Sequence, residues 1–370
     1  QSERTEIYTN YLKQLIKTKK AYISKEESVQ NPGTETEVVR LKNKGEIITF
    51  NDKIRGKIKF DTSELGNFVI ARSMTEPLYH LAVVVDDYEM GVTHVIRGED
   101  HISNTPRQIL IQRALGISEP KYAHIPLILA PDRSKMSKRK GSTSITEYRK
   151  NGYIKEAIIN YLAFIGWNPG TDKEIYSIDE LIKDFSLEKV QKGGAIFDTN
   201  KLNWFNREHI RALPNRDKLQ LFKDFLPEEI KKMPQYSEKR LNRISNEIIE
   251  RVYTLKELNE TALSGELDYF FDFPKIETKI SWKDDNVEIT KRHLNFVIEK
   301  LNKLPEDEFT YETIKETLWS YAESVGKGSV LWPMRVALSG KEKSPDPFTL
   351  SSIFGKEETI KRLKDAQKQL

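Results

Sequence analysis

The sequence of 370 residues has no cysteine and only a small excess of basic over acidic residues. Without thiols, the chain has no disulfides, no cysteine-ligated zinc and no thiol nucleophile. It has no run of about 18 apolar residues and therefore predicts no membrane span. Basic residues number 60 and acidic residues 56, which gives a net charge of only +4. Any contact with nucleic acid must therefore come from local basic patches.

The hydrophobic share of 38% is low and the charged share of 31% is high. With the length, this composition predicts about two to four helix-rich domains. Residues 2–20 carry an i, i+3, i+4 apolar stripe, which predicts one amphipathic helix. Short β-type runs separated by turn residues predict a small β-rich segment over 22–76. From residue 146 onward, apolar spacing and breaks at Pro or Gly predict a mainly helical chain.

The most informative stretch is 135–141, with the sequence KMSKRKG. An apolar run at 123–130 precedes it and predicts a buried strand, and residues 142–144 can cap a following helix. Lysines neutralise phosphate charge, the hydroxyl of Ser137 can donate, and Gly141 lets the backbone bend. The stretch thus predicts a phosphate-binding loop. The alternative is a solvated basic loop, which is what most basic runs are.

The segments before this loop predict a parallel sheet. The nearly continuous apolar run within 78–87 is typical of a buried parallel strand, and 91–97 predicts a second strand. A helix over 103–115 then leads to the strand at 123–130. In such doubly wound sheets, ligands bind beyond the carboxyl ends of the strands. We therefore expect Arg97 and the basic loop to share one crevice.

The basic loop resembles the KMSKS signature of class I aminoacyl-tRNA synthetases, in the KMSKR form that resembles glutamyl-tRNA synthetases. Residues 49–70, 77–101, 197–206 and 326–340 resemble the same family, the last being similar to a bacterial-type helical anticodon-binding domain. The resemblance implies an α/β plus all-α protein with part of a doubly wound, parallel, Rossmann-like sheet. Its implied segments are a catalytic-domain helix at 1–21, a connective-peptide (acceptor-binding) insertion at 22–76, the second half of the catalytic domain at 77–145, a helical stem-contact domain at 146–214 and a helical anticodon-binding domain at 215–370.

The resemblance implies ATP-dependent ligation of L-glutamate to tRNA-Glu through a glutamyl-adenylate. Attack of a carboxylate on the α-phosphate needs positioning and charge neutralisation, and no covalent enzyme nucleophile. The implied catalytic residues are Lys135, Ser137 and Lys138. The implied ATP-binding residues are Lys138, Lys135, Ile128, Leu127 and His124.

Arg97 and Tyr79 are the implied glutamate-binding residues. An arginine at a strand end suits a carboxylate, and the alternative is a salt bridge from Arg97 to Glu99 or Asp100. Tyr79 is equally well explained as a core residue. The implied tRNA-binding residues are Asn203, Trp204, Arg335 and Trp332, and packing in a helical core is the alternative for Trp332.

ATP with Mg²⁺ is the implied substrate. No zinc is predicted, because residues 21–25 contain no cysteine at the place where many relatives carry zinc-binding cysteines. His80, His94 and His124 lack an acidic spacing motif, so packing or hydrogen bonding explains them better than metal binding. The resemblance also implies tRNA-Glu as partner and a monomer in the cytoplasm without membrane contact.

The HIGH motif of the family occurs nowhere in the sequence. Its absence predicts that this chain alone does not form glutamyl-adenylate. The alternative function is a catalytically inactive tRNA-binding module derived from a synthetase, although such a module has no use for the phosphate loop. An unrelated nucleotide-binding α/β protein is a third hypothesis, which the runs at 49–70 and 197–206 disfavour.

Overall fold

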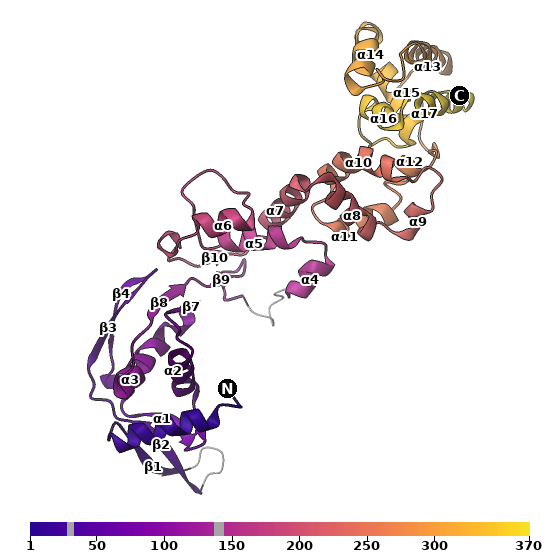
Figure 1. Ribbon diagram of the computed structural model, residues 1–370. Helices are drawn as coiled ribbons and strands as arrows, with labels where there is room; N and C mark the ends of the chain where they lie inside the picture. Colours follow the sequence, from indigo (N-terminus) through magenta and orange to yellow (C-terminus); the bar gives the residue numbers. More distant parts are fainter. Residues whose placement is uncertain (28–32, 137–143) are drawn as a thin grey trace. The chain divides into compact units, whose positions relative to one another are not determined.

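The computed structural model describes residues 1–27, 33–136 and 144–370. The chain forms two compact units, which are described separately below (Figure 1). The first unit comprises 1–142 with 159–198, and the second comprises 143–158 with 199–370. Every described strand lies in the first unit, and the described part of the second unit is helical, so the predicted α/β plus all-α class is confirmed. The finer domain boundaries at 76, 145 and 214 stay predictions.

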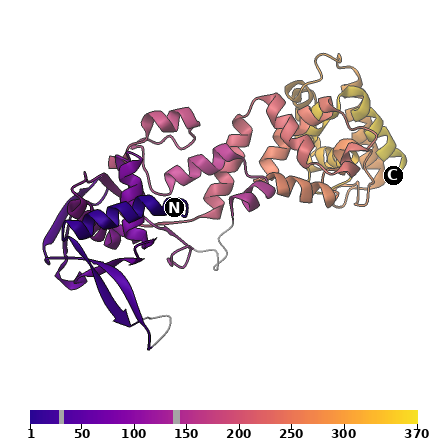
Figure 2. The same ribbon diagram turned by 60° about the horizontal axis from the view of Figure 1, so that its bottom comes forward.

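Helix α1 (Thr5–Lys17) packs against an antiparallel sheet with the strand order β1-β2-β5-β6. Its buried residues Tyr8, Leu12 and Leu15 lie on the predicted apolar stripe, which confirms the helix expected within 2–20. Figure 2 shows β1 and β2 extending beyond α1 as two long neighbouring strands. The strands of this sheet are β1 (Ala21–Glu27), β2 (Glu35–Leu41), β5 (Phe68–Ser73) and β6 (Glu76–Pro77).

A second sheet has the order β4-β3-β8-β7. Strands β3 and β4 form an antiparallel hairpin, and β3 runs parallel to β8 through the pair Asp52–Tyr122. Strand β7 also runs parallel to β8, and helix α3 connects them, as predicted. Figure 1 shows α2 (Tyr79–Glu89) and α3 beside these strands. The elements are β3 (Ile47–Asp52), β4 (Gly56–Asp61), η1 (Ser63–Leu65), β7 (His94–Gly98), η2 (Glu99–Asn104), α3 (Thr105–Leu115) and β8 (Lys121–Ile125).

The strand predicted within 78–87 is wrong, because Tyr79–Glu89 forms helix α2. The helix packs against α1, α3 and β5. A helix buried on most sides carries the same continuous apolar pattern as a buried parallel strand, and periodicity does not separate the two. Its nearly fully buried apolar residues are Leu81, Ala82, Val84 and Val85.

The strand predicted over 123–130 is interrupted. Strand β8 ends at Ile125, and a separate short strand β9 (Ile128–Leu129) follows Pro126. Proline has no N–H to donate to a strand ladder, which explains the break. Strand β9 pairs in parallel with β10 (Ala195–Ile196), so the chain leaves the second sheet at this point.

Ser144 caps helix α4 as predicted, since its side chain accepts a hydrogen bond from the N–H of Glu147. Further along, Trp167, Tyr176 and Leu181 form a small core in the first unit. The elements from 145 to 189 are α4 (Ile145–Lys150), α5 (Lys155–Phe164), α6 (Ile178–Asp184) and η4 (Leu187–Lys189).

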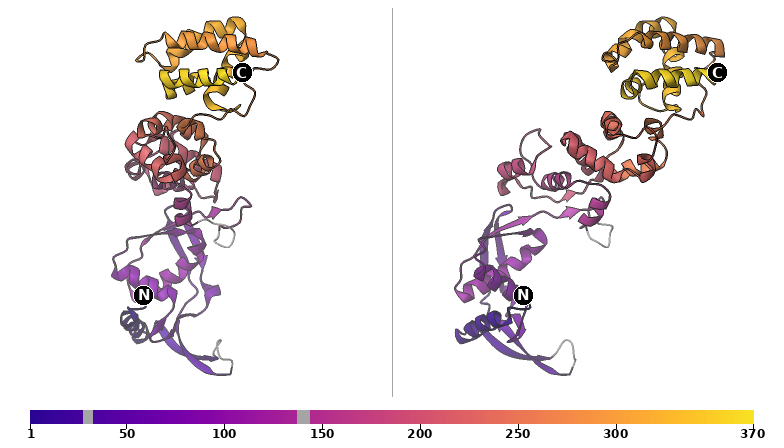
Figure 3. Two further views of the ribbon diagram at one scale, coloured as in Figure 1. Left: turned by 90° about the vertical axis from the view of Figure 1, so that its right-hand side faces the viewer. Right: turned by 45° about the vertical axis from the view of Figure 1, so that its right-hand side comes forward.

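The second unit is built around one large apolar core, and Figure 3 shows its last helices, coloured orange to yellow, gathered in one group. None of the helices in the described ranges is long and apolar enough to cross a membrane. The remaining helices are α7 (Thr199–Ala212), α8 (Asn215–Phe225), α9 (Glu228–Lys231), α10 (Glu238–Arg251), α11 (Leu255–Leu263), α12 (Asp268–Phe271), α13 (Val287–Asn302), α14 (Tyr311–Val325), α15 (Lys327–Ser339), α16 (Pro347–Phe354) and α17 (Lys356–Lys368).

Candidate active site

The candidate site lies at the carboxyl ends of the parallel strands β7 and β8. Arg97, near the end of β7, is partly buried. Its Nε–H donates to His124 Nε2 at 3.2 Å, and its Nη2 donates to Thr105 Oγ1 and Gln108 Oε1 at 2.8 Å each. Within the described ranges, no residue accepts a hydrogen bond from Nη1 of Arg97. Two N–H groups of the guanidinium fork are therefore left for a ligand.

The alternative of a salt bridge from Arg97 to Glu99 or Asp100 is wrong for this structure. Glu99 pairs with Arg55 at 2.5 Å, and Asp100 pairs with Lys135 at 2.6 Å. Arg97 takes part in no ion pair with any residue that the structure describes. A guanidinium without a carboxylate partner at a strand end suits an anionic ligand.

His124 is fully buried behind Arg97. Its Nδ1 lies 2.6 Å from Oδ2 of Asp52, which comes from β3. Its Nε2 faces Thr105 Oγ1 at 3.2 Å as well as Arg97. The side chain thus does not reach the surface, and this arrangement connects it to ligands only through Arg97 and Thr105. Its predicted direct contact with ATP stays a prediction.

Two titratable residues of α2 have shifted pKa values, and burial is the main cause for both. Burial lowers the pKa of His80, and the positive charges of Arg107 and Arg97 lower it further. Burial raises the pKa of Asp87, and the charge of Arg97 opposes that rise. Nδ1 of His80 is buried and has no hydrogen-bond partner in the described structure. The first turn of α2 therefore presents a neutral imidazole to the region of Arg97.

Tyr79 is the first residue of α2, and its side chain is 46% exposed. The alternative that Tyr79 is a plain core residue is therefore wrong. Its ring lies against that of His80, with 5.4 Å between the ring centroids. Tyr79 is therefore accessible to a ligand at the first turn of α2.

The basic loop begins within the described structure and continues beyond it. Leu129 and Lys135 form an antiparallel bridge, and the N–H of Met136 donates to the carbonyl of Ile128 at 3.1 Å. The ammonium group of Lys135 lies 2.6 Å from Asp100, three residues after Arg97. Arg97 and the start of the loop therefore belong to one edge of the sheet, as the topology predicted. Ser137 and Lys138 lie outside the described residues.

Of the two residues implied near the adenine, Leu127 lies between β8 and β9, and Ile128 is the first residue of β9. The N–H of Leu127 donates to Oε1 of Glu99 at 3.0 Å. Glu99 also pairs with Arg55, whose Nε donates to the carbonyl of His124 at 3.3 Å. This network ties the segment before the basic loop to the segment after Arg97.

The four residues implied in tRNA binding lie in two helices of the second unit. In α7, Asn203 accepts a hydrogen bond from the hydroxyl of Tyr153, and the ammonium group of Lys201 lies 4.4 Å from the Trp204 ring centroid. In α15, Nε1 of Trp332 donates to the carbonyl of Lys279 at 3.1 Å. Trp332 also packs against the core of this unit, which supports the packing alternative. Nε of Arg335, one turn further along α15, is buried and has no partner in the described structure.

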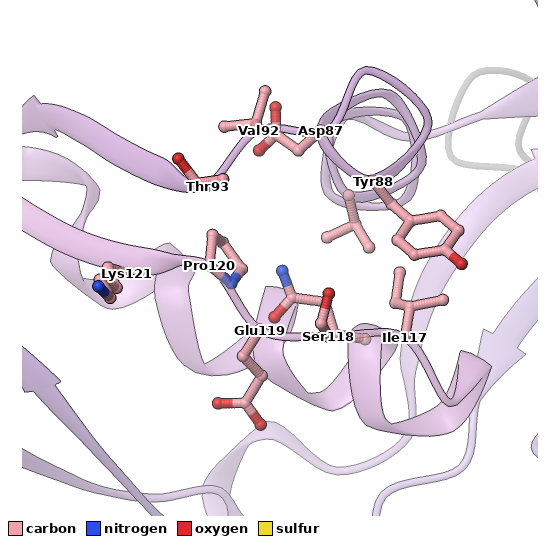
Figure 4. Close-up of a pocket in the computed structure, with 12 residues that line it drawn as sticks. Asp87, Tyr88, Val92, Thr93, Ile117, Ser118, Glu119, Pro120 and Lys121 are labelled. Carbon is pink, nitrogen blue, oxygen red and sulfur yellow. The ribbon is translucent and has the colours of Figure 1, made fainter.

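A pocket of about 380 Å³ lies at the opposite ends of the same strands (Figure 4). Thr93, just before β7, and Lys121, the first residue of β8, line it together with Asp87 and Tyr88. None of the predicted site residues lines this pocket. Ligands of open parallel sheets bind at the carboxyl ends of the strands, so this pocket is not the candidate active site.

Several residues that hold the site together were not predicted from the sequence. Asp52 accepts N–H bonds from Ile54 and Arg55 two and three residues later, as an aspartate does in a turn. The Asn-Asp-Lys sequence at 51–53 carries this turn signal, but nothing in it points to His124. Thr105 and Gln108 lie on the first turns of α3, where parallel α/β topology places residues near strand ends. In the part of the chain that the structure describes, no cluster of three or more His, Asp or Glu could hold a metal ion.

Comparisons with known proteins define the class. Residues 24–204 match the family of tRNA synthetases class I (E and Q), catalytic domain, and residues 217–367 match the anticodon binding domain family. A catalytic domain followed by an anticodon-binding domain makes the chain a class I aminoacyl-tRNA synthetase.

The relatives narrow this class. The chain is 43% identical to a glutamate–tRNA ligase of Thermodesulfovibrio yellowstonii, over 85% of this chain and 67% of that protein. It is 35% identical to glutamate–tRNA ligase 2 of Caldicellulosiruptor saccharolyticus, over 98% and 81%. The crystal structure of a glutamate tRNA ligase from Elizabethkingia meningosepticum, in complex with its amino acid, superposes with a TM-score of 0.76 at 31% identity, covering 100% of this chain and 83% of that one. The chain belongs to the glutamate–tRNA ligase family, and the predicted resemblance is confirmed.

Proposed function

We propose that this chain provides, at the carboxyl ends of β7 and β8, the site for L-glutamate and ATP in a protein that joins glutamate to tRNA-Glu through a glutamyl-adenylate. That the chain alone does not form the adenylate stays a prediction. The observation that carries the proposal is the hydrogen bonding of the Arg97 guanidinium, which occupies Nε and Nη2 and leaves Nη1 without an acceptor among the described residues. Three acceptors of the protein hold its Nε and Nη2, so the plane of the guanidinium is fixed. The remaining Nη1 pair is available for a carboxylate.

The chemistry assigns Arg97 to the side-chain carboxylate of glutamate. The α-carboxylate must attack the α-phosphorus of ATP, so that an O–P bond forms and the bond to pyrophosphate breaks. A carboxylate held by a guanidinium is a poorer nucleophile, so the group on Arg97 is the one that does not react. This also favours glutamate over glutamine, because a carboxylate accepts charge-assisted hydrogen bonds from a guanidinium on two oxygens, whereas a neutral amide offers only one uncharged oxygen.

The basic loop supplies the charge that the leaving pyrophosphate requires. Lys135, held near the site by Asp100, and Lys138 neutralise the phosphates, and Ser137 donates to them. Leu127 and Ile128 flank the adenine, Mg²⁺ accompanies ATP, and Tyr79 lines the glutamate pocket. The ribose hydroxyl of the tRNA then attacks the glutamyl carbonyl and AMP leaves.

Helices α7 and α15 provide the tRNA contacts in this proposal. Asn203 and Trp204 contact the stem, and Arg335 contacts the anticodon region, while Trp332 packs against the core of this unit and does not contact tRNA. The protein works as a monomer in the cytoplasm, where its substrates occur.

The test is glutamylation of tRNA-Glu by the full-length protein and its Arg97→Lys variant. Lysine retains the charge but loses the planar fork, which removes one of two charge-assisted hydrogen bonds worth about 1.5–3 kcal/mol. We expect kcat/KM for glutamate to fall about 10- to 150-fold. Arg113→Lys is the matched control, because Arg113 pairs with Glu119 at the other end of α3.

Two outcomes would contradict the proposal. One is a wild-type protein that does not attach glutamate to tRNA-Glu. The other is an Arg97→Lys variant that loses no more kcat/KM for glutamate than Arg113→Lys does.

A further inference from the structure

A buried pair of hydrogen-bonded side chains, Asp52 and His124, lies directly behind Arg97 and is not explained by substrate contacts. The side chains of Asp52 and His124 are both 0% exposed. They come from the parallel neighbours β3 and β8. Burying a carboxylate is costly unless its hydrogen bonds are satisfied, so its position beside the site calls for a physical explanation.

The hydrogen bonds of Asp52 keep it ionised. Its carboxylate accepts main-chain N–H bonds from Ile54, Arg55 and His124 at 3.0, 2.8 and 3.1 Å. Burial by itself would raise the pKa of Asp52, but these donors and the His124 ring lower that pKa below its ordinary value. An ionised carboxylate only accepts hydrogen bonds, so the Nδ1 atom of His124, 2.6 Å away, must carry the proton.

The opposite nitrogen of His124 is then an acceptor. Burial lowers the pKa of His124, although Asp52 opposes this, and a neutral imidazole has a single N–H. With that proton on Nδ1, the lone pair of Nε2 accepts from Nε of Arg97 and from the hydroxyl of Thr105, both at 3.2 Å. In this tautomer, the contact between His124 and Arg97 pairs one donor with one acceptor.

Two aromatic rings fix the plane of the imidazole. The Tyr122 ring stacks on His124 with an interplanar angle of 11° and 6.2 Å between centroids. The Phe50 ring meets it edge-on at 6.5 Å. The aromatic rings therefore hold the orientation of the imidazole, and Asp52 sets its tautomer. Together they point the lone pair of Nε2 at Arg97.

We propose that Asp52 and His124 are positioning residues for glutamate recognition: Asp52 selects the Nδ1–H tautomer of His124, and Nε2 of His124 fixes the guanidinium plane of Arg97 toward the substrate carboxylate. The inference rests on the proposed function of Arg97. In the other tautomer, an N–H of His124 would oppose the Nε–H of Arg97, and the two donors would turn the fork away. Neither positioning residue touches glutamate in this inference, because both side chains are fully buried.

Kinetics of the full-length protein separate this role from a structural one. Asp52→Asn permits the wrong tautomer, and His124→Leu removes the acceptor. We expect both to raise KM for glutamate roughly 10- to 100-fold while KM for ATP changes less than about twofold. His124→Gln retains one donor and one acceptor and should restore most of the glutamate affinity.

Asp86→Asn is the matched control. Asp86 is a buried carboxylate of α2 that accepts hydrogen bonds from Tyr8 and Arg4. These hydrogen bonds do not involve Arg97. We expect Asp86→Asn to lower the melting temperature as Asp52→Asn does, with KM for glutamate unchanged. Equal effects of Asp52→Asn and Asp86→Asn on KM for glutamate would overturn the inference.

A second measurement needs no variant. The ¹⁵N chemical shifts of the histidine ring nitrogens in the wild-type protein at neutral pH report the tautomer directly. We expect the Nδ1–H form for His124, and an Nε2–H form or an imidazolium overturns the inference even where the variants do not fold. If the wild-type protein does not charge tRNA with glutamate, the proposed function fails. If it does, and Asp52→Asn and His124→Leu leave KM for glutamate unchanged, only the positioning role fails.

Discussion

Arg362 in α17 is a buried cation whose removal tests how the second unit is held together. Its side chain is 0% exposed. Nη1 donates to the carbonyls of Tyr269 and Leu338 at 2.9 and 2.7 Å, and Nη2 donates to the carbonyl of Asp272 at 2.9 Å. Nε donates to Glu358 at 2.9 Å. One guanidinium thus joins α17 to the end of α15 and to the segment around α12.

The magnitude for Arg362→Met follows from these partners. Three buried carbonyls left without this donor cost about 1–3 kcal/mol each. Burial lowers the pKa of Arg362 to about 10, which shows that burying its charge is unfavourable. Methionine carries no charge, so the substitution removes this desolvation penalty and offsets part of the loss. Glu358 retains its pairing with Arg240 and is not left as a lone charge. The net loss in unfolding free energy is about 3–5 kcal/mol, as for other broken buried pairs.

Thermal unfolding followed by tryptophan fluorescence measures this loss, because Trp204, Trp282, Trp319 and Trp332 all lie in the second unit. For a unit of this size, the predicted loss lowers the melting temperature by about 6–20 °C. The control is Arg216→Met, at an exposed position of α8, which should change stability by less than about 0.5 kcal/mol. A melting temperature of Arg362→Met within the range of Arg216→Met would refute the reasoning.

Three further outcomes follow from the same structure. Because the pKa of His124 is lowered in the folded state, its contribution to stability is present above about pH 6.5 and is lost as the pH falls; the melting temperature of His124→Gln, measured against pH, should therefore decline less in acid than that of the wild type. Trp332→Phe removes the bond to Lys279, so it should cost about 1 kcal/mol in thermal unfolding while anisotropy titrations show unchanged affinity for tRNA-Glu. Gly340→Ala should cost more than about 2 kcal/mol in urea unfolding, because φ is +68° and an added Cβ would lie 2.3 Å from the carbonyl oxygen of Lys275.

Helix ends were predictable where a single residue near the end, such as a capping serine or a glycine, determines where the helix starts or stops. Helix α3 ends at Gly116, whose φ of 71° is the left-handed cap expected of glycine. Helix α4 begins at the predicted cap, Ser144. That α2 is a helix could not be predicted in the same way. Its four buried apolar residues pack against neighbours on several sides, and such a continuous apolar run does not distinguish a buried helix from a buried strand.

The candidate site was predictable where chain order decides the geometry. Parallel strands joined through α3 must end at the same edge, which brought Arg97 and the start of the basic loop together. Asp52 was not predictable, because it reaches His124 through a pairing of β3 with β8 that spans about 70 residues of chain. No local pattern encodes a contact of that separation.

This long-range pairing has a consequence for how substitutions act on the site. The β3–β4 hairpin falls within the segment that the resemblance assigns to the acceptor-binding insertion, yet its residue Asp52 is two hydrogen bonds away from the guanidinium of Arg97. The other strands of that segment, β1, β2 and β5, belong to a different sheet and do not pair with β8. Substitutions that shift Asp52 should therefore weaken glutamate binding without touching the ligand, whereas equally destabilising substitutions in β1 or β2 should leave KM for glutamate unchanged. Among the described strands of this segment, β3 is the one that supplies a side chain hydrogen-bonded to His124, which in turn accepts from Arg97, so the two halves of the segment should differ in their effect on glutamate binding.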